Sequence, residues 1–228
     1  MTDFDLIVIG GGTGNKVASA AADDDTSVAL IEPGRIGGTC LNRGCNPSKM
    51  VIQRADVVNT IREAGKFGID ASVEGFDFGA ITGEINDTLA AISDRMERQK
   101  MEDDNLTLIK EKAKFVDERT VEVGGETLTG EKIVVAAGSR PVVPGVIDGI
   151  EDVDYITSTE ALRLDEQPDE LVVIGGGYIA VELGYFYESM GTDVSIVEME
   201  PNLIPREDPD VSELFTRIAR ERHDVYTE

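Results

Sequence analysis

The chain has only two cysteines, Cys40 and Cys45, which lie close together within GGTCLNRGCNPSK at residues 37–49. Thiols at this spacing could form a structural disulfide, part of a zinc site or a redox-active pair. A disulfide that closes so short a loop stabilises little, and cytoplasmic proteins seldom keep one. Zinc would need two further ligands, and the single histidine, His223, is remote in sequence. A redox-active pair is therefore the preferred interpretation.

The residues that follow Cys45 favour a reactive thiolate. Pro47 suits the first turn of a helix, so Cys45 is expected near the positive end of that helix, where Lys49 adds positive charge. A thiolate in such a place attacks and leaves readily in thiol–disulfide exchange.

The stretch before the cysteines predicts a strand, a glycine turn, a helix and a second strand. The apolar run Phe4–Ile9 is typical of a strand buried on both faces, helical periodicity covers residues 14–23, and Val28–Ile31 is the next strand. Two longer helices and a group of short strands are expected further on, at residues 50–65, 78–105 and 106–136.

The opening pattern returns later in the chain. After residues 140–155, which are rich in proline and glycine, residues 170–198 again read as strand, glycine turn, helix and strand. This repeat predicts an α/β protein of three-layer type with two Rossmann-like units, at residues 1–149 and 150–228. The last residues read as a helix and the start of another strand, so the second unit is expected to be incomplete.

The first glycine turn matches a dinucleotide-binding motif with one departure. Gly10, Gly12 and Asn15 occupy the G-x-G-x-x-G positions, and Glu32 follows Gly10 by 22 residues. The glycines allow a tight turn and close approach of a pyrophosphate, and the helix N-terminus supplies N–H groups. Glu32 is placed to accept both hydroxyls of an adenosine ribose. Asn15 stands where a small residue is usual, although Gly14 adjoins it.

The second glycine turn matches the motif completely. Gly175, Gly177 and Ala180 occupy its positions, and Glu198 follows Gly175 by 23 residues. A carboxylate at Glu198 would repel a 2′-phosphate, so this unit is expected to prefer NAD(H). Two such motifs, each with its strand, helix and acid, predict two dinucleotide sites.

The charge of the chain limits its partners and its location. Its 45 acidic residues outnumber 21 basic ones, for a net charge of −24, and such a surface repels nucleic acid and anionic membranes. No apolar run approaches the roughly 20 residues that span a bilayer, and the acidic N-terminus is unlike a secretory signal. A cytoplasmic protein is expected, and the dispersed acids with few lysines are typical of a salt-loaded, halophilic cytoplasm.

Three features together resemble a known family. GGTCLNRGCNPSK, the two glycine motifs in this order, and VVAAGSRP at residues 134–141 are similar to the flavoprotein disulfide reductases of the pyridine nucleotide-disulfide oxidoreductase family. The resemblance runs from residue 4 to the end of the chain. It is closest to dihydrolipoyl dehydrogenases and mycothione reductases, and the group also includes glutathione and mercuric reductases.

The resemblance implies FAD in the first unit and NAD in the second. Cys45 would lie against the flavin as the charge-transfer thiol, and Cys40 would be the interchange thiol that meets the substrate. Lys49 would sit beside flavin N5, and Glu182 would point toward the nicotinamide. The other FAD-binding residues would be Gly10, Gly12, Gly14, Asn15, Glu32, Gly38, Thr39, Ala113 and Gly138. The other NAD-binding residues would be Gly175, Gly177, Tyr178, Ala180 and Glu198.

The resemblance also implies a reaction, in which electrons move between NAD(H), FAD, the cysteine pair and a small dithiol or disulfide. Glu198 favours a dihydrolipoyl dehydrogenase, because reductases of small thiols mostly prefer NADPH. Asn15 favours the alternative, a reductase of a mycothione or bis-γ-glutamylcystine type. A mercuric reductase fits less well, since additional cysteines are missing. A non-catalytic nucleotide-binding fragment is a further alternative.

The chain departs from the family pattern in length and near the cysteines. Family members continue into an interface domain that forms a homodimer and carries a histidine–glutamate pair, so we expect a C-terminally truncated chain with little activity of its own. His223 and Glu228 mimic that pair but are expected on the surface. Arg43 and Asn46 replace apolar residues, and an arginine there would either favour an anionic disulfide or simply face solvent.

Overall fold

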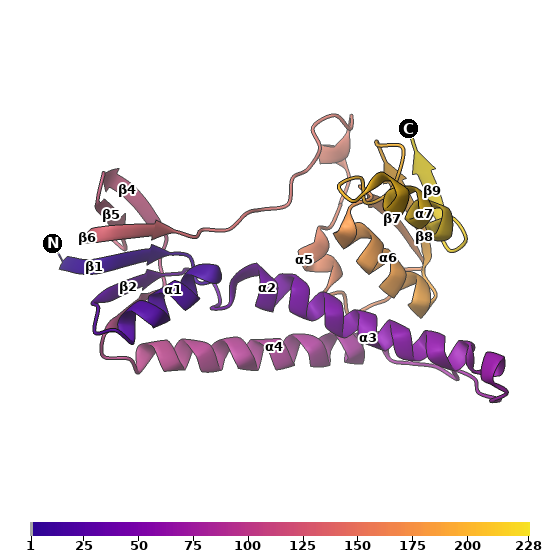
Figure 1. Ribbon diagram of the computed structural model, residues 1–228, viewed down its shortest axis with the longest axis horizontal. Coiled ribbons are helices and arrows are strands. Elements are labelled where there is room, and N and C mark those ends of the chain that lie inside the picture. The colour runs from indigo at the N-terminus through magenta and orange to yellow at the C-terminus, as the bar shows by residue number, and fades with distance from the viewer. Residues whose placement is uncertain (1) are drawn as a thin grey trace. The chain divides into compact units, whose positions relative to one another are not determined.

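The computed structural model describes residues 2–228, which form two compact units (Figure 1). Unit 1 comprises Met1–Asn46 and Asn86–Asp148, and unit 2 comprises Pro47–Ile85 and Gly149–Glu228. The long helices α3 and α4 contribute residues to both units; their bounds are Cys45–Arg62 and Phe78–Met101.

Unit 1 is built on a six-stranded sheet in the order β3-β2-β1-β6-β5-β4. The first four of these strands are parallel to one another, and β4, β5 and β6 form an antiparallel meander. The elements are β1 (Thr2–Ile9), α1 (Thr13–Ala22), β2 (Val28–Ile31), α2 (Gly38–Arg43), β3 (Leu106–Ile109), β4 (Ala113–Asp117), β5 (Thr120–Val123) and β6 (Glu126–Val135).

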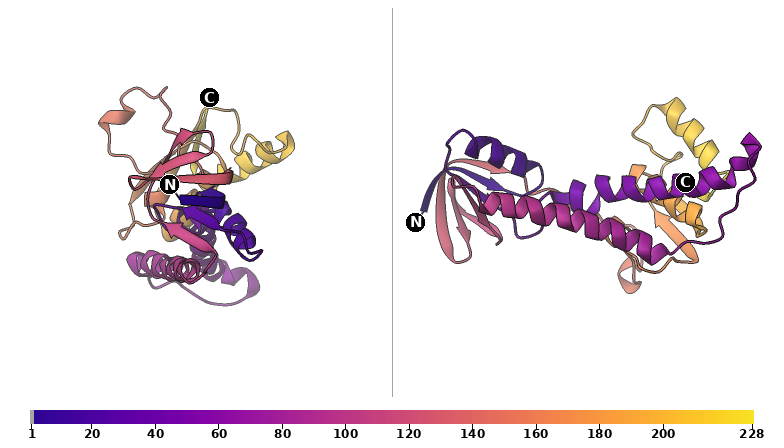
Figure 2. Two further views of the ribbon diagram at one scale, coloured as in Figure 1. Left: turned by 90° about the vertical axis from the view of Figure 1, so that its left-hand side faces the viewer. Right: turned by 90° about the horizontal axis from the view of Figure 1, so that it is seen from below.

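Alternate residues of β1 and β2 supply the two cores of unit 1. Leu6 and Val8 face α1 and the end of α4, where Ala18 and Met96 pack against the same cluster. In the left view of Figure 2 both helices lie on one side of the sheet. Ile7, on the opposite face, packs with residues of the meander. Burial on both faces explains the continuous apolar sequence of these strands.

Unit 2 contains a three-stranded parallel sheet in the order β7-β8-β9, in which β7 is an edge strand of the described chain. Apart from η1, its elements run from orange to yellow in Figure 1. They are η1 (Ala64–Phe67), η2 (Ile150–Asp152), α5 (Ser158–Ala161), β7 (Glu170–Ile174), α6 (Tyr178–Met190), β8 (Asp193–Glu198), α7 (Pro209–Ala219) and β9 (Asp224–Thr227), where η marks a turn of 3-10 helix.

Helix α3 is joined to α6 by polar side chains. The Asn59 amide donates to the Tyr185 hydroxyl at 3.1 Å and to the Ser189 hydroxyl at 2.8 Å. The Arg62 guanidinium donates to the Ser189 carbonyl at 2.7 Å. At the start of α4, the Phe78 ring stacks on Phe186 with 5.6 Å between centroids. These contacts make the helical segment part of unit 2.

The topology confirms the predicted fold class and corrects some details. Both predicted strand–glycine–helix–strand repeats are present, and the second sheet is the smaller. The helix expected over residues 78–105 ends at Met101, because Asp103 accepts the backbone N–H groups of Asn105 and Leu106 in a turn. Residues 47–85, which the sequence analysis assigned to the first domain, pack with unit 2.

Within residues 2–228, every helix is too short or too polar to cross a lipid bilayer.

Candidate redox and dinucleotide-binding site

The two cysteines stand on consecutive helices. Cys40 lies in the first turn of α2, and Cys45 is the first residue of α3, after a bend at Gly44. Both are exposed thiols, and the Cys40 Sγ donates to Asn46 Oδ1 at 3.7 Å. Interaction with the Cys45 thiol, followed by partial burial, raises the pKa of Cys40, while the positive charge of Lys16 opposes this rise. The two thiols are therefore close enough to interact.

The start of α2 is pressed against the first glycine loop. The Gly37 N–H donates to the Gly11 carbonyl at 2.8 Å. A Cβ added at Gly38 would lie 2.5 Å from the Cα of Gly12, so only glycine fits there. The loop that would cradle a pyrophosphate and the helix that carries Cys40 are thus one packed assembly.

The first glycine loop is enclosed on its other side by the segment after β6. Gly10 has a φ of 113°, and a Cβ added to it would lie 2.1 Å from the Ala136 carbonyl oxygen. A Cβ on Gly14 would lie 2.8 Å from Val8, so Gly14 provides the close helix–strand contact that the motif's third glycine normally makes. Asn15 is buried, and its Oδ1 has no hydrogen-bond partner among the described residues.

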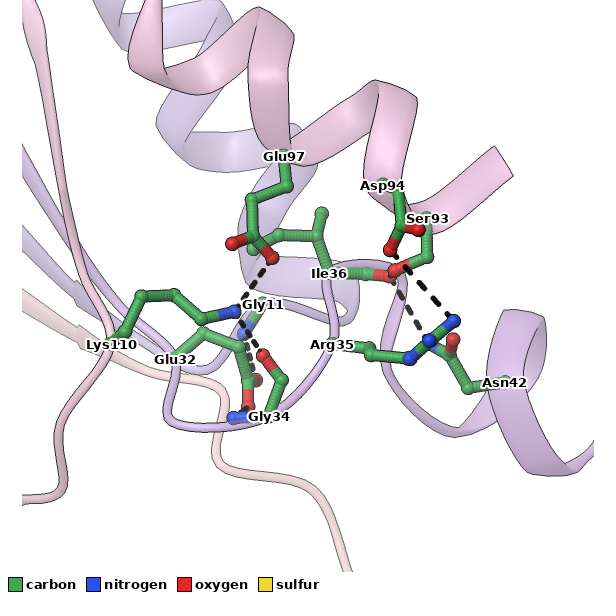
Figure 3. A network of polar contacts seen from close by, with 10 residues as sticks. All are labelled: Gly11, Glu32, Gly34, Arg35, Ile36, Asn42, Ser93, Asp94, Glu97 and Lys110. Atoms are coloured by element: carbon green, nitrogen blue, oxygen red, sulfur yellow. Dashed lines mark hydrogen bonds and ion pairs between the residues drawn. The ribbon is translucent and has the colours of Figure 1, made fainter. Parts of the chain in front are cut away.

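Glu32 is anchored at the end of β2 by backbone groups. Its Oε2 accepts the Gly11 N–H at 2.6 Å and its Oε1 accepts the Gly34 N–H at 2.7 Å (Figure 3). Lys110, at the end of β3, donates to the Gly34 carbonyl and pairs with Glu97 of α4 at 2.7 Å. The carboxylate predicted to meet an adenosine ribose is therefore held at the edge of the glycine loop.

Helix α4 fixes the segment between Glu32 and the cysteines. The buried Ser93 hydroxyl donates to the Ile36 carbonyl at 2.7 Å, and the Asn42 amide donates to the same carbonyl at 3.1 Å. Arg35 and Asp94 form an ion pair at 3.8 Å, and Figure 3 shows these contacts together. The sequence analysis did not predict the contact between Ser93 and Ile36, because the two residues are 57 positions apart. The only signal in the sequence is the position of Ser93 on an apolar face of the helix.

The remaining FAD candidates occupy different surroundings. Thr39 is exposed in the first turn of α2, while Ala113 begins β4 and packs partly against the second core of unit 1. Gly138 lies in the segment after β6, with a φ of 74° and open space around it. The contacts of Thr39, Ala113 and Gly138 with FAD therefore stay predictions.

Lys49 and Glu182 are brought together within unit 2. The Lys49 ammonium group pairs with Glu182 Oε1, and the Ser48 hydroxyl donates to Oε2 at 3.1 Å. Lys49 was expected to add charge beside the cysteines, but here it pairs with the carboxylate of α6. The residue predicted beside the flavin and the residue predicted near the nicotinamide are thus direct partners.

The second glycine loop repeats the first but is more open. Glu198 accepts the Gly176 N–H at 2.6 Å and the Glu200 N–H at 2.9 Å. Among the described residues, only chain neighbours lie within 4 Å of a Cβ built at Gly175 or Gly177. Tyr178 and Ala180 lie in the first turn of α6, where Tyr178 is 70% exposed.

His223 differs from its expected place on the surface. It is half-buried and lines a mainly apolar pocket with Val181, Tyr185 and Phe215, and its Nδ1 has no hydrogen-bond partner in the described chain. Burial lowers the pKa of His223. It belongs to the packing around α6 and α7.

The residues present fit two dinucleotides. Gly12 and Gly177 immediately precede α1 and α6, and neither helix has a side-chain cap, so their N-terminal N–H groups are available to a pyrophosphate. Glu32 and Glu198 offer carboxylates at the matching strand ends. The fold and site define an α/β protein with paired dinucleotide loops and a dithiol attached to the first.

The chain belongs to the pyridine nucleotide-disulphide oxidoreductase family, whose model matches residues 4–227. It is 37% identical over 222 residues to a mercuric reductase of Staphylococcus aureus, covering 96% of this chain and 40% of that protein. Against a mycothione reductase of Mycobacterium tuberculosis the identity is 33%, over 100% of this chain and 50% of that protein. Against dihydrolipoyl dehydrogenase 3 of Haloarcula marismortui the identity is 35%, over 96% of this chain and 47% of that protein.

Comparison with solved structures supports the same family. The HOCl-induced flavoprotein disulfide reductase RclA from Escherichia coli superposes with a TM-score of 0.83 at 29% identity, over 98% of this chain and 49% of that chain. The chain thus spans about half the length of the curated relatives and structures it matches. Members of this family use FAD and NAD(P), which confirms the family resemblance and the cofactors that it implied.

Proposed function

We propose that this protein transfers electrons between NAD(H), FAD, the Cys40–Cys45 pair and a small dithiol or disulfide. One observation carries the proposal: Gly37 and Gly38, which precede the cysteine helix, pack directly on Gly11 and Gly12 of a dinucleotide loop. This packing joins a thiol pair to the loop expected to hold a redox cofactor. A dithiol elsewhere on the surface would have no such connection.

The chain's own residues would perform the thiol exchange. The Cys40 thiolate would attack one sulfur of a substrate disulfide, which forms a mixed disulfide and releases one thiol. The Cys45 thiolate would then attack the Cys40 sulfur, which releases the second thiol and leaves a Cys40–Cys45 disulfide. The substrate gains two electrons and two protons, and the cysteine pair loses them. Oxidation of a dithiol substrate is the reverse.

FAD and NAD supply hydride and electron transfer when bound. The first glycine loop and Glu32 would hold FAD, and the second loop and Glu198 would hold NAD. Lys49 and Glu182 are paired with each other in unit 2, and their roles beside the flavin and the nicotinamide stay predictions from the family resemblance. A homodimer and a cytoplasmic location stay predictions from the family resemblance and the composition.

Dihydrolipoamide with NAD is the first candidate substrate pair, because a carboxylate at Glu198, the position expected to meet the ribose, would repel the 2′-phosphate of NADP(H). The second candidate is a low-molecular-weight disulfide that carries carboxylates. It is favoured by Arg43, which is exposed on the same short helix as Cys40. Hg(II) is a further compound for the turnover assays described below, since the mercuric reductase of S. aureus is among the similar proteins.

An absorption spectrum of the purified protein with FAD, taken before and after addition of one equivalent of dithionite, tests the redox part. We expect flavin bands and a long-wavelength shoulder on two-electron reduction, and we expect Cys45→Ser to lose the shoulder while keeping the bands. A protein that binds no FAD, or a shoulder that survives in Cys45→Ser, would refute the assignment.

Turnover assays then separate the substrates. Dihydrolipoamide with NAD, bis-γ-glutamylcystine or mycothione with NADH or NADPH, and Hg(II) with NADPH are compared, with Cys40→Ser as the control in each. Turnover that persists in Cys40→Ser would exclude Cys40 as the interchange thiol.

A further inference from the structure

Acidic residues are absent from two stretches of sequence that contain the first glycine loop and the cysteines. The chain carries 45 acidic residues among 228, about one in five, yet residues 6–22 and residues 33–55 contain none. These two segments hold the first glycine loop and both cysteines. Their basic residues are Lys16, Arg35, Arg43, Lys49 and Arg54. Glu32 lies between the two segments, and both of its carboxylate oxygens accept backbone N–H groups. The two segments themselves are cationic in a chain whose net charge is −24.

Three of these five cations are engaged elsewhere. Arg35 pairs with Asp94, Lys49 pairs with Glu182, and Arg54 donates to the Gln53 side chain and the Met50 carbonyl. Lys16 and Arg43 have no ion-pair partner within residues 2–228. Both side chains are exposed. They are thus the two cations of the site that remain available to a ligand.

Lys16 and Arg43 both lie near Cys40. Lys16 is in the first turn of α1, and Arg43 is in the last turn of α2. The Gly12–Gly38 contact joins the starts of α1 and α2, which places the first turn of α1, with Lys16, next to the first turn of α2, with Cys40. Arg43 follows Cys40 by three residues on α2, a spacing at which side chains are neighbours on a helix surface. From the other elements, the titratable and charged groups that act on Cys40 are Lys16 of α1 and Cys45 of α3.

We propose that Lys16 and Arg43 are specificity-determining residues that select, at Cys40, sulfur compounds carrying a carboxylate. The proposal rests on the proposed thiol exchange, and it favours the second candidate substrate, a disulfide that carries carboxylates, over neutral dihydrolipoamide. A chain of this net charge repels anions over most of its surface, so an anionic substrate needs a local cationic site to reach the thiol. The Arg43 guanidinium can bind a carboxylate through two parallel hydrogen bonds, and the Lys16 ammonium group acts as a point charge.

Alkylation of Cys40 tests the proposal without turnover or a bound cofactor. In a Cys45→Ser background Cys40 is the only thiol, so its rate constants with anionic iodoacetate and neutral iodoacetamide can be measured separately. The ratio of the two rate constants reports the charge that an approaching anion meets. Lys16→Met and Arg43→Met are compared with Lys114→Met, an exposed lysine of β4 in the same unit that gives the same change in net charge.

We expect Lys16→Met and Arg43→Met each to lower the iodoacetate-to-iodoacetamide ratio about threefold at low salt, and the double variant to lower it further. Lys16→Arg should keep the parent ratio, and Lys114→Met should leave it unchanged. The decreases caused by Lys16→Met and Arg43→Met should become smaller as the salt concentration approaches 1 M, because the Debye length falls to about 3 Å. The proposal is overturned if the ratio is the same in all variants, or if Lys114→Met changes it as much as Lys16→Met does.

The outcome is separable from that of the proposed function. A shifted ratio in a protein that shows no flavin bands would support the cationic site and refute the redox assignment. An unshifted ratio in a protein that turns over would refute the cationic site alone.

Discussion

The two glycine loops share one arrangement around their middle glycine. The Gly11 N–H donates to Glu32 Oε2 at 2.6 Å, and the Gly176 N–H donates to Glu198 Oε2 at 2.6 Å. In each unit the second carboxylate oxygen accepts an N–H two residues further on. Because each acid lies at the end of the second strand of its own unit, a single βαβ unit suffices to build this feature.

The carbonyl of the middle glycine is also satisfied in the same way. Gly11 accepts the Gly37 N–H at 2.8 Å, and Gly176 accepts the Ile204 N–H at 2.7 Å. The residue before each donor, Ile36 or Leu203, is fully buried against the glycine. The segment after the acid therefore folds back on the loop in both units.

The outer sides of the loops differ. Strand β1 lies between β2 and β6, so the segment after β6 covers Gly10, whereas β7 is an edge strand of the described chain and Gly175 has open space beside it. Val172 of β7 is 64% exposed, while Ile7, at the corresponding position of β1, is fully buried. The comparison teaches that the βαβ unit itself sets the acid–glycine geometry, and that a neighbouring strand sets how far the loop is enclosed.

The largest expected effect separates the two loops at their first glycine. Gly10→Ala meets both a positive φ and the Ala136 carbonyl, so we expect it to lower the free energy of unfolding by about 4 kcal/mol. Gly175→Ala meets only a positive φ of 101°, and we expect a loss of about 1–2 kcal/mol. Chemical denaturation followed by circular dichroism measures both. Equal losses would contradict the difference in enclosure.

The next effect probes what the loops share. Ile36→Ala and Leu203→Ala should each lower the free energy of unfolding by about 2–4 kcal/mol, because each removes a fully buried side chain that backs a middle glycine. Val142→Ala is the control, since Val142 is 87% exposed and its loss should cost under about 0.5 kcal/mol. A large decrease in the free energy of unfolding at only one of the two buried sites would show that the two loops are not supported in the same way.

A smaller effect is expected at the paired acids. Glu32→Gln and Glu198→Gln keep the side-chain length but remove the charge from two hydrogen bonds, so each should lower the free energy of unfolding by about 1–2 kcal/mol. FAD affinity should fall about tenfold only for Glu32→Gln, and NADH affinity only for Glu198→Gln. Fluorescence titrations measure both affinities, with exposed Glu131→Gln as the control. Loss of both affinities in one variant would show that the two sites are not independent.

The smallest effect concerns unit 2 alone, because His223 is the single histidine of the chain. Burial lowers the pKa of His223 in the folded state, so below its ordinary value of about 6.5 the unfolded chain binds a proton that the folded chain does not. Stability should therefore decrease as the pH falls through that value and level off below the folded-state pKa. Urea titrations between about pH 5 and pH 8 should show this slope in the parent protein.

The His223→Leu variant serves as the comparison for that slope. It should show less pH dependence over the same range while keeping the packing of α6 and α7. A slope that is identical in parent and variant would assign the pH dependence to other groups.

The sequence by itself determined the elements whose signals are local. Apolar runs specified β1 and β2, glycine patterns located both turns, and the spacing to Glu32 and Glu198 located the acids, because each signal depends on the periodicity or turn geometry of one βαβ unit. The position of Cys45 at the start of a helix followed from Pro47. These features needed no knowledge of the rest of the chain.

Tertiary structure alone decided the contacts between distant residues. Gly14 rather than Asn15 packs against β1, Ser93 clamps the loop before the cysteines, and Lys49 pairs with Glu182. None of these pairs shares a local pattern, because each depends on which helix face packs against which strand or loop. The nearness of α1 to Cys40 and the open edge beside Gly175 follow from the same cause: strand order and packing, rather than local pattern, determine a residue's neighbours.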